Sequence, residues 1–236
     1  MSELRVGGFL PFTTIDFPGE LAAVVFCQGC PWRCRYCQNG DLLSRNSEHE
    51  TSWTEVMNQL QHRVGLLDAV VFSGGEPTMQ VGLTSAINQL RGLGFKIGLH
   101  TAGCYPERLE KVLQIVDWVG LDIKTLPEEY QNITTIPDSG ERAWTSLQLL
   151  LNSGVAYEVR ITVHELLTPP ESLRQLLTKL SEKNVRHLVL QTCQWQTALD
   201  VDLGPCTIDW MEWARQFSDM FDVLSVRTGA DGELQL

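Results

Sequence analysis

The sequence contains no long apolar run, because no hydrophobic stretch approaches the ~20 residues that a membrane-spanning helix needs. Basic residues are also few: 18 Lys and Arg stand against 29 Asp and Glu, which gives a net charge of −11. Such an acidic balance disfavours a general binder of nucleic acid or of anionic membranes. Residues 1–5 lack the basic and apolar segments of a signal peptide. We therefore expect a soluble cytoplasmic protein with neither nucleic acid nor a membrane as partner.

Internal repeats, low-complexity tracts and linkers rich in glycine, serine or proline are absent from the sequence as well. The chain has 236 residues, of which 43% are hydrophobic, so it is long enough for one sizeable core and short for two. We expect a single domain over residues 1–236, with a core over about 20–195 and a C-terminal extension over about 205–236.

Short apolar runs alternate with amphipathic segments along most of the chain. Six of these runs are predicted to be strands, at residues 22–26, 69–73, 96–101, 118–124, 157–163 and 187–192. Strands that alternate with helices favour an α/β fold with a parallel sheet and right-handed crossovers. The tail is expected to add a helix over residues 208–221 and a last strand over 223–228.

Two helix starts can be read from local signals. Ser52 and Glu55 have the spacing of a capping box, in which each side chain bonds the backbone N–H of the other residue. Thr168 is predicted to cap another helix, with Pro169 at its first position.

Charged side chains recur on one face of the predicted strands. Because successive side chains point to opposite faces, Asp122 and Lys124 lie opposite the apolar face of their strand, and Arg160 does so in the next. A sheet covered on both sides would normally be apolar throughout. The polar inward faces therefore predict a cavity for a charged ligand; the alternative is that these residues lie at strand ends and reach solvent.

The cysteines are present in an unusual pattern. There are seven, an odd number, and four of them fall within the eleven residues from Cys27 to Cys37. In a chain without an export signal this pattern indicates metal binding rather than disulfides. The other three are expected to be ordinary buried or partly exposed thiols, namely Cys104, Cys193 and Cys206.

Cys30, Cys34 and Cys37 have the spacing C-x3-C-x2-C, with Tyr36 just before the last cysteine. Three thiolates can hold three irons of a four-iron cluster and leave the fourth iron open, and an open coordination position is where metal chemistry occurs. Two alternatives use Cys27 as a fourth ligand: a fully coordinated cluster, as in an electron carrier or redox module, and a zinc site. Nearby Arg33 and Arg35 are expected to favour ionised thiols.

Further polar residues follow other predicted strands. The run Ser-Gly-Gly-Glu-Pro at residues 73–77 combines glycines, which let a backbone approach a ligand closely, with the carboxylate of Glu76, which can accept bonds from an ammonium group; on its own the run is also typical of a turn. Arg160 could neutralise a carboxylate, or pair with Glu158 or Asp122. For Asp122 and Lys124 the alternative is a structural salt bridge.

The C-x3-C-x2-C spacing, the aromatic before its last cysteine and the Gly-Gly-Glu-Pro run resemble the radical S-adenosylmethionine (SAM) superfamily. The stretch Gly-Phe-Leu-Pro-Phe-Thr-Thr-Ile-Asp-Phe-Pro-Gly at residues 8–19 resembles the glycyl-radical-enzyme activating family within it. Among these, the chain is most similar to the longer form of the anaerobic ribonucleoside-triphosphate reductase activating proteins. The resemblance covers roughly residues 5–195.

This resemblance implies an incomplete (βα)6 TIM-like barrel with a short C-terminal helix and strand extension. It implies a [4Fe-4S] cluster on Cys30, Cys34 and Cys37, whose fourth iron binds the amino and carboxylate groups of SAM. The SAM contacts that it implies or leaves as candidates are Tyr36, Gln38, Gly74, Gly75, Glu76, Pro77, Thr101, Asp122, Lys124, Arg160 and Gln191. No side chain is expected to be catalytic, since the radical comes from SAM.

The implied reaction is reductive cleavage of SAM to a 5′-deoxyadenosyl radical, which abstracts hydrogen from a backbone glycine of a partner glycyl radical enzyme. The implied partners are an anaerobic ribonucleoside-triphosphate reductase and a one-electron donor such as flavodoxin or ferredoxin. The chain departs from formate-lyase activases at Gln38 and at residues 191–195, where those have histidines, and it lacks a ferredoxin-like insert. The alternative within the superfamily is an enzyme acting on a small molecule, peptide or RNA.

Overall fold

The computed structural model describes residues 3–46, 51–228 and 232–236, so the first two residues of the N-terminal stretch considered above lie outside it. Among the described residues, nine strands form one sheet in which the strands follow the order of the chain. Strands β2 to β8 are parallel, whereas β1 and β9 join the two edges in antiparallel fashion. Because β1 and β9 remain edges, the sheet is open, which confirms the predicted incomplete barrel.

The strand bounds agree closely with the prediction from apolar runs. They are β1 Val6–Thr13, β2 Ala22–Cys27, β3 Ala69–Gly74, β4 Lys96–Thr101, β5 Trp118–Asp122, β6 Ala156–Val163, β7 His187–Thr192, β8 Val223–Thr228 and β9 Gly232–Gln235.

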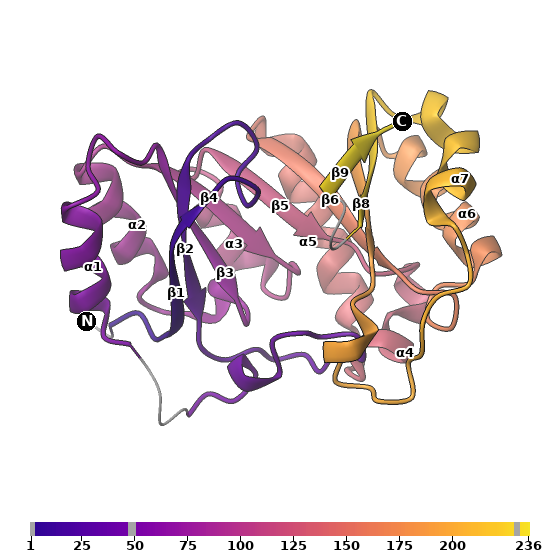
Figure 1. Cartoon of the computed structure of the whole chain (residues 1–236), viewed down its shortest axis with the longest axis horizontal. Helices are drawn as coiled ribbons and strands as arrows, with labels where there is room; N and C mark the ends of the chain where they lie inside the picture. Colours follow the sequence, from indigo (N-terminus) through magenta and orange to yellow (C-terminus); the bar gives the residue numbers. More distant parts are fainter. Residues whose placement is uncertain (1–2, 47–50, 229–231) are drawn as a thin grey trace.

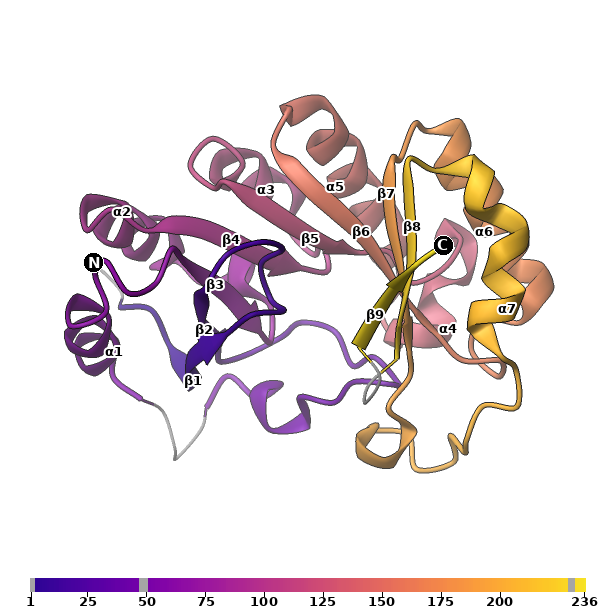
Figure 2. The ribbon, with the colours of Figure 1, turned by 45° about the horizontal axis from the view of Figure 1, so that its top comes forward.

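Helices lie along the outer side of the curved sheet, as Figures 1 and 2 show. The α-helices are α1 Trp53–Gln61, α2 Leu83–Gly92, α3 Pro106–Val112, α4 Tyr130–Thr134, α5 Ser139–Ser153, α6 Pro170–Glu182 and α7 Trp210–Ala214. Short 3-10 helices are η1 Gly40–Leu42, η2 Pro77–Met79, η3 Pro127–Glu129, η4 Trp195–Thr197 and η5 Arg215–Met220. Within the described residues, none of the helices is long and apolar enough to cross a membrane.

The ends of the sheet differ from the sequence-based expectation. Strand β1 was not predicted, because glycine and proline are depleted in strands and this one, VGGFLPFT, is an edge strand with register irregularities. The tail strand β8 joins the same sheet as a seventh parallel strand, and β9 then turns back beside it. The helix expected over 208–221 divides into α7 and η5.

Of the two predicted helix starts, one is confirmed and one is wrong. The capping box of Ser52 and Glu55 is present with both of its hydrogen bonds. Helix α6, in contrast, begins one residue later than predicted, because the carbonyl oxygen of Pro169 accepts its first helical bond, from the N–H of Leu173 at 2.9 Å. The hydroxyl of Thr168 caps nothing and has no hydrogen-bond partner among the described residues.

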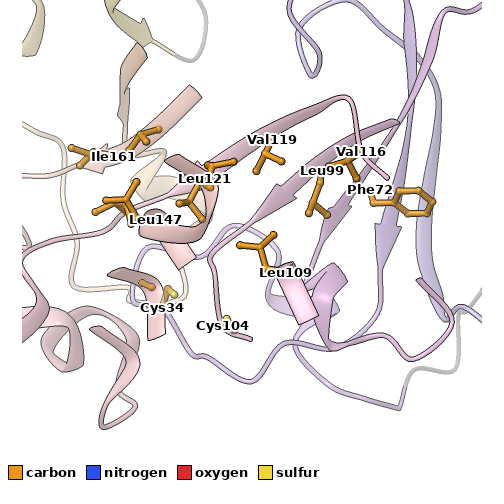
Figure 3. Close-up of a cluster of buried hydrophobic side chains, with 14 of the residues drawn as sticks. Cys34, Phe72, Leu99, Cys104, Leu109, Val116, Val119, Leu121, Leu147 and Ile161 are labelled. Atoms are coloured by element: carbon orange, nitrogen blue, oxygen red, sulfur yellow. The ribbon is translucent and has the colours of Figure 1, made fainter. Parts of the chain in front are cut away.

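The outer, apolar faces of the strands form the main core with the helices. Leu99, Leu121 and Ile161, from three neighbouring strands, belong to one buried cluster with Leu109 of α3 and Leu147 of α5, as Figure 3 shows. Cys34 and Cys104 lie at the edge of the same cluster (Figure 3). The predicted apolar side of β4, β5 and β6 therefore packs against helices.

The inner face of the sheet is divided along the strands. Toward their N-terminal ends, a second buried cluster contains Phe17, Ala22, Val24, Ala69, Val71 and Trp118. Phe17 stacks on Trp118 with ring centres 5.3 Å apart. The segment after β1 thus closes that end of the barrel with apolar groups, and the polar inner residues lie toward the C-terminal ends of the strands.

Candidate cofactor site

The cysteine loop follows β2 and is held by the segment just after it and by two segments that are distant in the sequence. The N–H of Cys30 donates to the carbonyl of Leu43 at 3.2 Å, and the N–H of Arg35 donates to Ile133 at 3.0 Å. On the far side, the N–H of Asp200 donates to the carbonyl of Arg35 at 2.8 Å. Backbone hydrogen bonds therefore fix a loop that has no regular secondary structure of its own.

The three thiols of the loop differ in their surroundings. Cys34 is buried, whereas Cys30 and Cys37 are partly exposed. Burial raises the pKa of Cys34 to about 11 and also raises the pKa of Cys37. The pKa of Cys30 is lowered, chiefly by a hydrogen bond with the thiol of Cys104, a residue that was expected to be an ordinary thiol. No sequence pattern signals this contact, since Cys104 follows a different strand.

Lys124 is a cation that acts on all three thiols: its charge favours the ionised form of each, although burial still leaves the pKa of Cys34 and Cys37 raised. This corrects part of the expectation for the arginines. Arg33 contributes at Cys37 alone, and its side chain mainly donates to the carbonyl of Cys30 at 2.8 Å. Arg35 points away and pairs with Asp200 at 2.7 Å.

The arrangement of donors suits a cluster better than a single ion. Within the described part of the chain, no three His, Cys, Asp or Glu side chains converge on one ion position. Zinc needs its ligands around one atom, whereas a four-iron cluster offers separate irons to separate thiolates. Cys27 ends β2 inside the core, and burial raises the pKa of its thiol well above the usual range. The chemistry of Cys30, Cys34 and Cys37 is compatible with a cluster, and their role as its ligands stays a prediction.

The two glycines after β3 are required by close backbone contacts. A Cβ atom on Gly75 would lie 2.3 Å from the carbonyl oxygen of Gly29, and Gly74 has a φ of 98°, which L side chains rarely adopt. The glycines thus let this loop pack directly against the start of the cysteine loop.

Glu76 is fully buried and its carboxylate is already bonded within the protein. One oxygen accepts from the N–H of Thr78 at 3.0 Å, from the hydroxyl of the same residue at 2.6 Å and from the hydroxyl of Thr101 at 2.7 Å. The other oxygen accepts from the N–H of Ala102 at 3.0 Å. The carboxylate therefore ties the loop after β3 to the end of β4, and its contact with a SAM ammonium group stays a prediction.

Asp122, Lys124 and Arg160 meet on the inner face, as predicted. Nε of Arg160 donates to Oδ1 of Asp122 at 3.1 Å, and Nζ of Lys124 lies 3.7 Å from Oδ2 of the same carboxylate. The alternative of internal salt bridges is therefore realised for these residues. Lys124 also lies 5.2 Å from the ring centre of Tyr36, so this charged group reaches the cysteine loop.

Three other predicted residues lie outside both the cysteine loop's thiols and the charged group of Asp122, Lys124 and Arg160. Gln38 is exposed, and Gln191 is partly buried and in register with Arg227 of β8. Pro77 is buried and begins η2. In the described residues, neither Gln38 nor Gln191 makes a hydrogen bond to Asp122, Lys124 or Arg160.

Two residues of the site were missed from the sequence. The hydroxyl of Tyr130 accepts from the N–H of Lys124 at 2.9 Å, and its ring packs edge-on against Trp32 of the cysteine loop. No sequence pattern marks it, because it lies in the short helix α4. Arg227, which pairs with Glu158, could have been found from the alternation of polar and apolar residues in the predicted last strand.

Comparison with known proteins identifies one superfamily. The family model of the Radical SAM superfamily matches residues 24–190. A Methanocaldococcus jannaschii protein named as a glycyl-radical enzyme activating enzyme (MJ1227) is 33% identical over 141 residues, which cover 58% of this chain and 57% of that protein. The pyruvate formate-lyase-activating enzyme of Clostridium pasteurianum is 32% identical over 74% of each chain. The chain thus spans little more than half the length of the first relative.

Among solved structures, the fold is similar to that of anSMEcpe with bound AdoMet and the Kp18Cys peptide. The TM-score is 0.66 at 15% identity, over 85% of this chain and 61% of the other. At this identity the similarity concerns the fold alone.

Proposed function

Because this chain belongs to the radical SAM superfamily, whose members use a [4Fe-4S] cluster and SAM, we propose that it activates a glycyl radical enzyme. The relatives named as activating enzymes support this proposal. We further propose that the partner is an anaerobic ribonucleoside-triphosphate reductase. This finer assignment rests on the resemblance of residues 8–19 and on the absence of a ferredoxin-like insert.

In this proposal Cys30, Cys34 and Cys37 hold the cluster. When bound, the cluster would supply the electron for reductive cleavage of SAM. It would take this electron from a donor such as flavodoxin or ferredoxin. The loop keeps its shape through the backbone bonds described above. Lys124, buried beside this loop, favours the ionised thiols that iron needs.

The observation that carries the proposal is the contact of the charged inner group with the cysteine loop. Lys124 and Arg160 both pair with Asp122, so the group carries two cations on one anion. Glu158, the other carboxylate near Arg160, is paired with Arg227, so Arg160 and Lys124, which lies next to Tyr36, are the cations that can receive the carboxylate of SAM. The residues act by binding and orienting SAM, and no side chain transfers the hydrogen.

The open sheet agrees with a polypeptide substrate. Strands β1 and β9 are the two edges of the described sheet and do not pair with each other, and the proposed site lies at the carboxyl ends of the parallel strands. A structural neighbour holds a peptide together with AdoMet. We propose that a glycine loop of the partner reaches the site in this chain, where a backbone glycine loses hydrogen.

Glycyl radical formation tests the proposal directly. The reconstituted and reduced protein is mixed under anaerobic conditions with SAM and an anaerobic ribonucleotide reductase, and electron paramagnetic resonance (EPR) spectra are recorded. A glycyl radical doublet that requires both SAM and this protein is expected. If SAM is cleaved while the reductase stays without a radical, the proposed partner is wrong.

A second candidate function is modification of another peptide. The peptide bound to the structural neighbour favours it. Formation of 5′-deoxyadenosine with a short peptide, and without any glycyl radical enzyme, would support this alternative.

A further inference from the structure

Strand β8 lies beyond the residues that the superfamily model matches, and yet it contributes a charged side chain to the barrel interior. Nη1 and Nη2 of Arg227 bind the two carboxylate oxygens of Glu158 on β6, at 3.1 and 3.3 Å. Nε of the same guanidinium donates to Oε2 of Glu233 on β9 at 2.8 Å. The C-terminal extension is thus joined to the inner face by a bidentate ion pair.

Glu158 is also the nearest competing anion for Arg160. The two residues are two positions apart on β6, so both side chains face the interior. Nη1 of Arg160 lies 3.9 Å from Oε1 of Glu158, which is too far for a hydrogen bond. Arg160 instead donates to Asp122 at 3.1 Å and to the carbonyl of Gly120 at 3.1 Å. In this structure Arg160 is bonded to Asp122 while Glu158 is bonded to Arg227.

We propose that Arg227 is a positioning residue for SAM binding. By pairing with Glu158, it leaves Arg160 with Asp122, beside Lys124. The inference rests on the proposed function, since it concerns what holds the proposed SAM contacts in place, and it assigns a role to the extension that the superfamily match does not cover.

The physical reason lies in burial. Glu158 is only 6% exposed and Arg160 only 7%. A buried carboxylate that loses its partner is costly unless another cation replaces it. Without the charge of Arg227, Arg160 is the cation within reach, because it needs to move its guanidinium by less than one bond length to bind Glu158. Asp122 would then pair with Lys124 only, and the guanidinium of Arg160 would no longer lie beside Lys124.

The experiment compares R227Q with the double variant E158Q/R227Q in reconstituted protein. SAM affinity is measured by equilibrium dialysis, together with iron content. R227Q is expected to weaken SAM binding about tenfold or more at unchanged iron content. The double variant is expected to regain most of that loss, because the neutral amide at position 158 no longer competes for Arg160. A purely structural pair would show this loss and rescue in the free energy of unfolding, measured alongside, and not in the SAM affinity of the folded protein.

Two further variants complete the test. E233Q, which removes the exposed partner of Arg227, should change affinity by less than about twofold. R227K, which keeps the charge but loses the fork, should give an intermediate affinity and serves if R227Q does not fold. Wild-type affinity in R227Q or R227K, or a double variant no better than R227Q, would overturn the inference alone. Wild-type protein that does not bind SAM would overturn the proposed function itself.

Discussion

The cysteine loop and the charged inner face of the sheet are the two halves of the proposed site, and they are positioned by different means. The loop shares backbone hydrogen bonds with two segments far away in the sequence, residues 133–134 and 199–200. The charged residues are placed by strand register, since Asp122 pairs directly with Arg160 between β5 and β6. The comparison teaches that the loop should tolerate side-chain changes in the segments that bond its backbone. The geometry of the inner face, in contrast, depends on each of its charged side chains.

The largest expected effect comes from the loop half. Cys34→Ala removes one of three thiolates and should abolish SAM cleavage, since loss of a direct ligand exceeds the roughly 10- to 100-fold cost of losing a residue that only supports one. The measurements are iron content and 5′-deoxyadenosine formation. Cys193→Ala, at a partly exposed cysteine outside the loop, is the matched control and should retain both. Substantial cleavage by the Cys34 variant would refute the ligand assignment.

In the inner face, Lys124→Ala should weaken SAM binding by roughly tenfold to a hundredfold, because a buried charged contact contributes about 1.5–3 kcal/mol. Lys124 only assists ionisation and is not a ligand, and the three cysteines remain, so the reconstituted iron content should stay close to that of the wild type. Lys96→Ala, which removes an ion pair between β4 and Glu20 in the turn before β2, is the control and should bind SAM normally. Equal affinities in the two variants would remove Lys124 from the pocket.

A smaller effect is expected when the position of Arg160 is changed and its charge is kept. A Cβ atom on Gly120 would lie 2.6 Å from Cζ of Arg160, so Gly120→Ala displaces the guanidinium while leaving every charge in place. SAM affinity should fall by about three- to tenfold. Gly92→Ala, at a helix position with nothing within 4 Å, should leave binding intact and add about 0.5–1 kcal/mol of stability. An unchanged affinity in Gly120→Ala would mean that the position of Arg160 does not matter.

The smallest effect concerns pH. His100 is held neutral between Ser73 and the carbonyl of Asp16, and burial, with the charges of Arg160 and Arg227, lowers its pKa well below the usual value. The unfolded chain binds a proton here below about pH 6.5 and the folded chain does not, so stability should fall as pH drops below that value, by at most about 1.4 kcal/mol per unit. Urea unfolding of the cluster-free protein should show a shallower pH dependence for His100→Gln. Identical slopes would contradict this assignment.

The two halves also differ in how far the sequence predicts them. The positions of Asp122, Lys124 and Arg160 followed from the period of two in strands, and the capping box at Ser52 followed from local spacing. Tyr130 and Asp200 could not be found in this way. Asp200 lies 165 residues from its partner Arg35, and only the folded chain brings such residues together. Glu76 shows the same limit. The sequence predicts a ligand contact for its carboxylate, but it does not predict the four hydrogen bonds that this carboxylate accepts within the protein.

Both halves matter only if one iron of the cluster lacks a protein ligand. The most direct test is the EPR spectrum of the reduced, four-iron protein with and without SAM. With three cysteine ligands, SAM binds the open iron and the spectrum should shift. A spectrum that SAM does not change, in protein with a full iron content, would mean that the cluster is fully coordinated, with Cys27 as the first residue to suspect, and it would contradict the central claim.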